Sequence, residues 1–457
     1  MANFTTRADS DLAYGWVVQP DGRGTIDILY NCLVTTFLCS WSALFLNIPA
    51  EYIGPLAFVA HKLRFMIFAI AFPEMLTGMA AEQWRSACQS VEDFSQLAKR
   101  WESASRLCQP FGSDSQAKEN LNRLKCSPWT MRHAFFADMG GFLLDCPGCR
   151  PFPIDAQQLL YVVENYYLEY PNVEKRTIED RDKADGFARA ITLTQIVWFL
   201  VQSLGRTVQH LDLSTIELST LAFIFCTLNT FFFWRHKPLD VVTPIVLSCS
   251  TPIEEILIGA GKGPQKPYSQ TPLDFVKPPV SRRSLCAPFW FGIKTVLDWR
   301  ERSNDLPIKA FENSRTIPPR GLAAADLVFA IIFSFSYFGI HLAGWNFVFP
   351  SRTEQLLWRV SSLTLLGLLV IYLAAVVFGT VMGGWLARTF FDNYEETTIL
   401  GVGSLLPRWT AILFHGPVVA AYALARMYII VEGFVSLRSL SFTAFASVDW
   451  SKLVGGT

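Results

Sequence analysis

The chain has 457 residues, of which 51% are hydrophobic and 17% are charged. Soluble domains carry about 25% charged residues, so this composition favours a membrane protein. Lys and Arg balance Asp and Glu at 39 each. A net charge of zero excludes the strongly basic surface that recruits nucleic acid, and we expect no nucleic-acid partner.

Seven long apolar segments predict membrane-spanning helices. A hydrocarbon core about 30 Å thick needs roughly 20 apolar residues of helix. The clearest segment runs from Trp358 to Ala387 and contains a single charge, Arg359. The predicted fold is an all-α, polytopic helical membrane protein in which residues 1–457 form one membrane domain. The expected spans lie near residues 28–48, 63–81, 189–210, 213–234, 323–348, 357–387 and 409–433.

Two polar segments separate these spans and read as large loops. Residues 82–187 are predicted to be partly helical, with amphipathic stretches around 91–108 and 155–170. Residues 236–321 are rich in proline and basic residues, which is typical of extended chain. Within the second segment, residues 239–260 are apolar but are interrupted by two prolines and two glutamates. Seven spans are therefore favoured, and residues 239–260 remain a candidate for an eighth.

The distribution of Lys and Arg predicts the orientation. With seven spans, the segments rich in Lys and Arg all fall on one side, which the positive-inside rule makes cytosolic. The N-terminal tail would then be cytosolic and the sequon at Asn3 unglycosylated. A reporter fused after Pro267 is expected to read cytosolic, and a lumenal reading would restore the eighth span. The expected location is the endoplasmic reticulum or another endomembrane, with the protein spanning it several times.

The second span carries a carboxylate at membrane depth. Pro73 is predicted to kink the helix, and Glu74 follows it directly. A carboxylate in lipid is either protonated or paired. Glu74 is therefore either the partner in a salt bridge to another helix or a proton donor.

Polar residues also line one face of the third span. Gln195, Gln202 and Arg206 recur at helical spacing. Such a face cannot point to lipid, and it either joins helices to one another or lines a pocket. Glu217 begins the next span and can pair with Arg206 across a tight hairpin.

Two later spans repeat this pattern. The fifth places Tyr337, His341 and Trp345 on one helical face, and the last places Tyr422 and Arg426 on another. These side chains are expected to face the interior of the bundle, where they can contact a ligand.

The polar segments contain two further candidates for chemistry. His133 and Asp138 are five residues apart and form either an acid–base pair or a surface turn. Asp180, Asp182 and Asp185 superficially match the aspartate clusters that bind magnesium diphosphates, but basic residues are interleaved and the spacing is irregular. A solvated helix start is the better interpretation of these aspartates.

Metals and cofactors have little support in the sequence. Cys146 and Cys149 form a lone C-P-G-C pair, and one such pair is a weak signal for zinc. The known phosphate-loop, metalloprotease and dinucleotide motifs do not occur. We expect neither a metal nor a cofactor.

Several segments together resemble a large group of multi-pass membrane proteins of filamentous fungi, most of which have no assigned activity. The resemblance covers nearly the whole chain and rests on GWVVQPDGRGTIDILYNCLVTTFLCSW, HAFFADMGGF, EDRDKADGFARAITLTQIVWFLVQ, WRHKPLD and RMYIIVEGFVSLR. Membrane proteins of similar size in fungal secondary-metabolite clusters include terpene cyclases of ascofuranone-type meroterpenoid pathways. Those enzymes open a terminal epoxide by protonation, and no catalytic motif of theirs matches this chain residue by residue.

The favoured function is a membrane-embedded, metal-independent terpene cyclase (an isomerase) that acts on a prenylated, epoxidised small molecule in fungal secondary metabolism. This chemistry needs a protonated acid, aromatic faces that stabilise a cation, and exclusion of water. The candidate acids are Glu74, Glu217 and Asp138. The alternatives are a magnesium-dependent membrane prenyltransferase using the aspartate cluster, and a non-enzymatic transporter or scaffold. The candidate substrate-binding residues are Gln195, Gln202, Arg206, Tyr337, His341 and Trp345.

Overall fold

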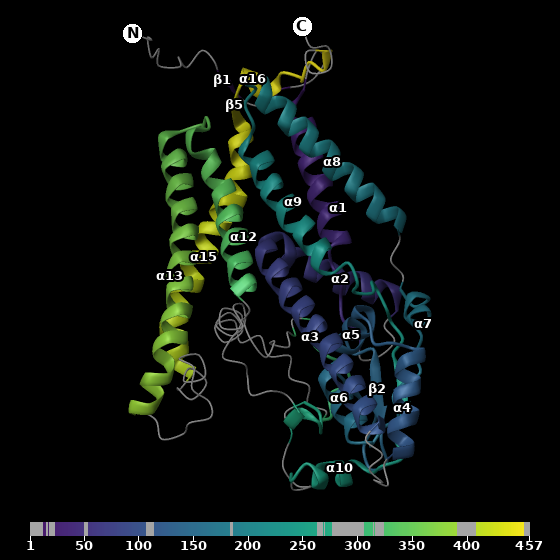
Figure 1. Ribbon diagram of the computed structural model, residues 1–457. Helices are drawn as coiled ribbons and strands as arrows, with labels where there is room; N and C mark the ends of the chain where they lie inside the picture. Colours follow the sequence, from purple (N-terminus) through teal and green to yellow (C-terminus); the bar gives the residue numbers. More distant parts are fainter. Residues whose placement is uncertain are drawn as a thin grey trace.

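The computed structural model consists of a bundle of long helices and a smaller mixed head (Figure 1). Asn3, Asp185 and Pro267, which the sequence singles out, lie outside the residues that it describes. The described residues are 12–14, 17, 23–49, 54–106, 114–182, 186–262, 268, 270–276, 306–313, 315, 324–390 and 408–451.

Six long helices lie side by side in the bundle. Helix α9 is its centre, because it contacts α1 on one side and α12 and α15 on the other. Helix α8 packs on the outer side of α1, and α13 packs on α15. The helices are α1 (Thr25–Ser42), α8 (Gly186–Val208), α9 (Thr215–Phe233), α12 (Ala324–Ala343), α13 (Arg352–Phe390) and α15 (Arg408–Val435).

Five of the described helices are long and apolar enough to cross a membrane, which confirms a mostly helical, membrane-type protein. They coincide with five of the expected spans. Their apolar windows are Gly186–Val208, Thr215–Phe233, Ala325–Asn346, Arg352–Ala374 and Gly416–Arg438.

The structure differs from the sequence prediction at the other two spans. Helix α1 ends at Ser42 rather than near residue 48 and is not one of those five. The expected span 63–81 is broken between α2 (Pro55–Ala71) and α3 (Pro73–Arg106), which meet at 106°. The predicted kink at Pro73 is confirmed, but a straight span is wrong. Proline lacks an N–H and disfavours the helical conformation of the residue before it, and Phe72 indeed leaves the helix at φ −136° and ψ 59°.

Exposed side chains of the bundle are apolar along continuous stripes. On α1, Ile26, Tyr30, Leu33 and Phe37 are exposed and recur every three or four residues. Helix α8 exposes a similar stripe of aliphatic side chains, whereas its Arg206 is only 2% exposed. Lipid-facing surfaces have this pattern, with charged groups turned inward.

The segments predicted as large loops are folded in their described parts and form the head. Helix α3 continues into it, and a three-stranded sheet of order β3-β2-β4 lies beside α3. Strand β2 pairs antiparallel with β3 and parallel with β4. Apolar side chains from both segments share one core. The elements are α4 (Asp114–Cys126), α5 (Met131–Asp138), β2 (Phe142–Asp145), β3 (Phe152–Ile154), α6 (Ala156–Glu164), α7 (Lys175–Glu179), β4 (Ile245–Ser248), α10 (Ile253–Gly259) and η2 (Asp274–Val276).

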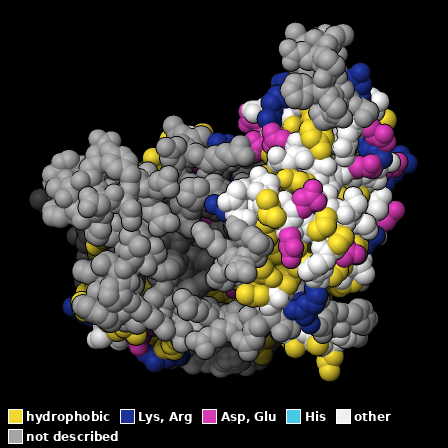
Figure 2. All heavy atoms as spheres, turned by 90° about the horizontal axis from the view of Figure 1, so that it is seen from below, with side chains coloured by type: hydrophobic (Ala, Val, Ile, Leu, Met, Phe, Trp, Pro, Cys, Tyr) yellow, Lys and Arg dark blue, Asp and Glu magenta, His cyan; other side chains and the backbone are white. Residues whose placement is uncertain are grey.

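Residues 239–260, the candidate eighth span, supply β4 and the short helix α10 of the head. A strand of four residues and a helix of seven are too short to cross a bilayer. Figure 2 views the head end and shows charged side chains of both signs scattered among apolar ones on the described surface of the head. Such a surface suits contact with water.

Both terminal segments meet at the end of the bundle opposite the head (Figure 1). Strand β1 (Leu12–Tyr14), which precedes α1, pairs antiparallel with β5 (Ser439–Ser441), which follows α15. We call this end the terminal face. It also carries η3 (Gly344–Asn346), η4 (Ser436–Arg438) and α16 (Phe442–Phe445).

Candidate functional site

The break between α2 and α3 fixes the position of Glu74. Pro73 is the first residue of α3, and Glu74 lies in its first turn. The N–H groups at the start of a helix have no partners within it, so this position is favourable for an acidic side chain. One edge of Glu74 remains at the protein surface, whereas its Oε2 atom is fully buried.

Helices α12 and α15 complete the surroundings of Glu74. The Tyr422 hydroxyl donates a hydrogen bond to Glu74 Oε1, and its ring stacks on Phe72 at 5.8 Å between centroids. The Tyr337 hydroxyl lies beside the same carboxyl group. We call Glu74, Tyr337, His341, Tyr422 and Arg426 the intramembrane cluster.

Arg426 holds the cluster together without taking the carboxylate as its partner. Its Nε donates to the carbonyl oxygen of Ala71 at 3.0 Å, and Nη1 lies 3.2 Å from His341 Nε2. The other ring nitrogen of His341 lies 3.2 Å from the Tyr337 carbonyl oxygen. A guanidinium can only donate and a carbonyl can only accept, so His341 is neutral with its proton on Nδ1.

Glu74 Oε2 and the Tyr337 hydroxyl are buried beside each other, and neither makes a hydrogen bond of good geometry to a described residue. Buried polar atoms are normally paired, and exceptions often mark a functional position. Aromatic rings continue from here along α12: Tyr337 stacks on Phe333 at 6.5 Å and Phe333 on Phe225 at 5.3 Å.

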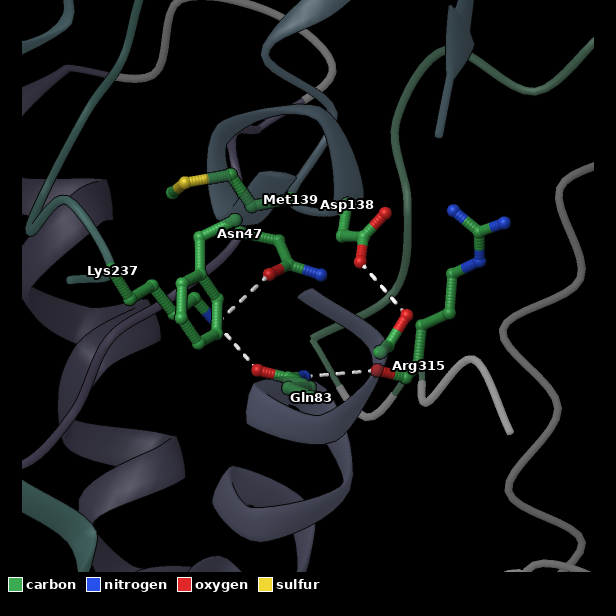
Figure 3. Close-up of a pocket in the computed structure, with 8 residues that line it drawn as sticks. Asn47, Gln83, Asp138, Met139, Lys237 and Arg315 are labelled. Carbon is green, nitrogen blue, oxygen red and sulfur yellow. Dashed lines mark hydrogen bonds between the residues drawn. The ribbon is translucent and has the colours of Figure 1, made fainter. Parts of the chain in front are cut away.

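A second group of buried charges lies in the head (Figure 3). Lys237 Nζ donates to Gln83 Oε1 at 3.0 Å and to Asn47 Oδ1 at 3.3 Å. Asp138 accepts from Ser86 Oγ at 3.2 Å and from the Ala156 N–H at 3.1 Å. Burial lowers the pKa of Lys237 to about 7, and burial together with nearby Asp155 raises the pKa of Asp138 to about 7.

The cavity between these groups is small. Its volume is about 10 Å³, which is near the minimum for a single water molecule. Pockets for organic ligands measure about 300–1,000 Å³. We therefore interpret Asp138 and Lys237 as part of a buried polar network that joins α3, α5 and the segment after α9.

Titration of Asp138 gives a testable pH dependence. The native state binds a proton at Asp138 up to about pH 7, whereas the unfolded chain releases it near pH 4. Stability relative to Asp138→Asn should therefore increase as the pH falls from 7 to 4, by on the order of 1–3 kcal/mol. Lys237, whose pKa is about 7 in the native state, is fully protonated in both states only well below pH 7, so the change in stability between pH 5.5 and pH 4 reports on Asp138 alone. Thermal unfolding of both proteins in detergent at pH 4, 5.5 and 7 measures the difference. A stability difference between the two proteins that does not change with pH would contradict the raised pKa of Asp138.

Asp138 and His133 do not form the pair considered from the sequence. Burial lowers the pKa of His133, whose Nε2 lies 2.8 Å from the Val173 carbonyl oxygen. Its Nδ1 lies 2.8 Å from Thr130 Oγ1. The two side chains therefore have separate partners, and neither the acid–base pair nor the surface turn is found.

Glu217 is far from Glu74, at the terminal face. It accepts hydrogen bonds from the N–H and hydroxyl of Ser214 at the start of α9 and forms an ion pair with Arg23. The expected pair of Glu217 with Arg206 is wrong, because Arg23 from a distant segment takes that place. These contacts suit the start of a helix rather than an acid catalyst.

The polar face of α8 joins segments of the protein together. Arg206 donates to four backbone carbonyl oxygens, at 2.8–3.0 Å. Gln195 Nε2 donates to Thr35 Oγ1 of α1 at 2.9 Å. Gln202 is half-buried between them. Of the two alternatives for this face, the structure supports helix joining. The four carbonyls belong to Asp212, Thr443, Ala444 and Ala446.

Trp345 does not share the face of Tyr337 and His341. Helix α12 ends at Ala343, and Trp345 lies in the 3₁₀ turn that follows. A 3₁₀ helix has 3.0 residues per turn, so the direction of its side chains departs from the α-helical pattern. Trp345 is 36% exposed, and the Arg359 guanidinium lies 4.9 Å from the centre of its ring.

The aspartate cluster has a structural use in its described part. Asp182 forms an ion pair with Arg132 at 2.9 Å and accepts from the Leu239 N–H at 2.8 Å. Asp180 follows the last residue of α7. Among the described residues, no group of three or more His, Cys, Asp or Glu is arranged to hold a metal ion.

The sequence placed Glu74, Tyr337 and His341 among the site residues, and the structure brings these three together. Tyr422 and Arg426 complete them, although the sequence identified only their shared face. An arginine within an apolar helix is a usable signal for such a residue. Lys237 was missed because it lies just beyond a helix, in a segment that reads as exposed loop.

Comparison with known proteins places the chain in one family. The model of a family of unknown function, DUF8562, matches residues 1–258 and 326–455. No curated protein and no solved structure matches the chain. The match covers well over half of the sequence, and the chain therefore belongs to this family of unknown function.

Proposed function

We propose that the protein is a membrane-embedded terpene cyclase in which Glu74 starts the reaction. The substrate would be a prenylated, epoxidised small molecule of secondary metabolism that reaches the cluster from the bilayer. The observation that carries this proposal is a carboxyl group with a buried oxygen, beside the Tyr337 hydroxyl at the end of a series of aromatic rings.

The reaction is an isomerisation and needs no further reactant. Glu74 gives its proton to the epoxide oxygen while a carbon–oxygen bond breaks, and an alkene electron pair closes the new ring. The final cation loses a proton to a base, for which the Glu74 carboxylate is the candidate. Arg426 points its hydrogen-bond donors at Ala71 and His341 rather than at the Glu74 carboxyl group.

The surroundings of Glu74 suit a cationic intermediate. Aromatic faces attract positive charge by about 0.5–2 kcal/mol each. The rings of Tyr337, Phe333 and Phe225 form a connected series between α12 and α9. Glu74 is only partly buried, and in this proposal an apolar substrate reaches it laterally from the bilayer.

Product analysis tests this proposal. Membranes of a host that expresses the chain are supplied with prenylated epoxides, with and without a magnesium chelator. A cyclised isomer of unchanged mass, formed equally in both arms and absent from membranes without the chain, is the expected result. Loss of product in the chelated arm would favour the magnesium-dependent prenyltransferase. No product from any epoxide would favour the transporter or scaffold.

We also propose a revised arrangement in the membrane, with six crossings rather than seven. Helix α1 packs along α8 and α9, and its 18 residues measure about 27 Å. Together with the five candidate spans, α1 gives an even number of crossings. An even number is required because the pairing of β1 with β5 places the start and the end of the bundle on the same side of the membrane. Helices α2 and α3 would form a re-entrant segment whose turn reaches the intramembrane cluster, and α2 has an exposed apolar side that includes Leu56, Leu63 and Ile67.

This arrangement reverses the expected position of the N-terminal tail. Among the described residues, the terminal face holds few Lys and Arg residues, among them Arg23, Arg206, Arg352 and Arg438, whereas the head holds many. By the positive-inside rule, this arrangement makes the head the cytosolic side and the tail lumenal.

Glycosylation of the tail checks this orientation. In a eukaryotic host the sequon at Asn3 should be modified, and an endoglycosidase should increase the gel mobility of the chain. Asn3→Gln should remove that shift, and a reporter after Pro267 should still read cytosolic. A protease-accessible tail on sealed vesicles, without glycan, would restore seven spans.

A further inference from the structure

Two cysteines from distant segments lie side by side at one end of the head's sheet. The parallel register of β2 and β4 pairs Asp145 with Ser248, and Cys146 and Cys249 are the next residue of each strand. The Cys249 N–H donates to the Asp145 carbonyl oxygen at 2.8 Å, so the ladder continues to this point. The Cys249 thiol accordingly lies beside the thiol of Cys146.

A tight turn brings a third thiol, that of Cys149, close to Cys146. The Cys149 N–H donates to the Cys146 carbonyl oxygen at 3.3 Å. Gly148 has φ +85°, a left-handed conformation that favours glycine. Cys146 and Cys249 are 3% and 6% exposed, whereas Cys149 is half-exposed. All three are free thiols. The arrangement is a buried pair with one thiol within reach of solvent.

We propose that Cys146 and Cys249 form a reversible disulfide and that Cys149 is the thiol through which oxidation enters. The oxidant is a small-molecule disulfide. Cys149 attacks it as the thiolate, forms a mixed disulfide and releases one small thiol. Cys146 then attacks the Cys149 sulfur and releases the second small thiol. Finally Cys249 attacks the Cys146 sulfur, which frees Cys149 and leaves the Cys146–Cys249 bond.

The backbone geometry suits this bond. Neighbouring strands lie about 4.8 Å apart, within the Cα separation of about 4.4–6.8 Å that disulfides require. The bond would join β2 to β4 at the one pairing that attaches residues 245–248 to the rest of the sheet. A disulfide at this point would therefore tie two remote segments of the head together.

The order of the steps follows from access and charge. Burial raises the pKa of the Cys146 and Cys149 thiols, but Arg150 opposes that effect at Cys149 alone. The thiolate is the attacking species, so the half-exposed thiol beside a cation reacts first. A shared metal ion is the competing use of three thiols. The described residues offer no arrangement of three or more ligands for one, which favours the disulfide.

Oxidation of the purified full-length protein in detergent tests the proposal. The protein is incubated with oxidised glutathione, trapped with an alkylating agent, digested and mapped by mass spectrometry. We expect a Cys146–Cys249 cross-linked peptide that disappears after reduction. Cys149→Ser should form the same cross-link at least about tenfold more slowly, because the entry thiol is missing. Cys88→Ser, which changes a half-exposed thiol of α3, is the matched control and should leave the rate unchanged.

Three results would overturn the proposal. The first is no Cys146–Cys249 cross-link in folded protein at saturating oxidised glutathione. The second is an unchanged rate in Cys149→Ser, which would remove the entry role. The third is one equivalent of zinc in the purified protein that is lost in Cys249→Ser, which would make this a metal site. None of these readouts depends on cyclase activity.

Discussion

Replacing Glu74 by glutamine should lower cyclase turnover by a factor of about 10²–10⁴, the usual range for loss of a general acid. The amide can still accept the hydrogen bond from Tyr422, so the cluster keeps its shape. It has no acidic proton to give to an epoxide oxygen. Expression, membrane insertion and the thermal unfolding temperature in detergent should stay close to those of the unmodified protein.

Glu432→Gln is the matched control for that variant. Glu432 is a buried carboxylate of α15 that accepts a hydrogen bond from Tyr428 at 3.1 Å, away from the aromatic series. The same chemical change there should leave turnover within about twofold. Normal turnover by Glu74→Gln would show that another group supplies the proton. An equal loss in both variants would mean that any buried charge change disrupts the bundle.

The intramembrane cluster was predictable in outline because the membrane makes polar side chains costly. A helical repeat of Tyr337 and His341, and a carboxylate next to Pro73, have few stable positions other than the interior of the bundle. The same reasoning failed at Trp345, because one 3₁₀ turn changes the direction of the side chains. It failed at Glu217 because the sequence does not show that Arg23 would arrive there.

The head was not predictable from local pattern. Its two segments are polar on average. Their apolar residues meet only after β2 pairs with β4, and these two strands are separated in the sequence by the membrane helices α8 and α9. Lys237 and Cys249 acquire their neighbours by the same long-range step. Periodicity detects one face of one element, whereas these contacts depend on register between elements distant in the chain.

Replacing Arg206 by methionine should destabilise the terminal face by about 3–5 kcal/mol. The guanidinium is 2% exposed and satisfies four backbone carbonyl oxygens at once. Methionine fills a similar volume but leaves those acceptors buried without donors, and each unsatisfied group costs about 1–3 kcal/mol. The expected loss of stability is smaller than the sum over four carbonyl groups, because some of these groups can shift and bind water instead. The chain should unfold at a lower temperature in detergent, and residues 443–446 should become sensitive to protease first.

Arg206→Lys separates the donors from the charge. Lysine keeps the positive charge but has one ammonium with three donors, which cannot reproduce the planar fork that contacts four carbonyls. Its stability should fall between those of the unmodified protein and Arg206→Met. If the lysine variant is as stable as the unmodified protein, charge alone is sufficient at this position. If the methionine variant is as stable, the carbonyls find other donors, and Arg206 does not hold the C-terminal segment against α8.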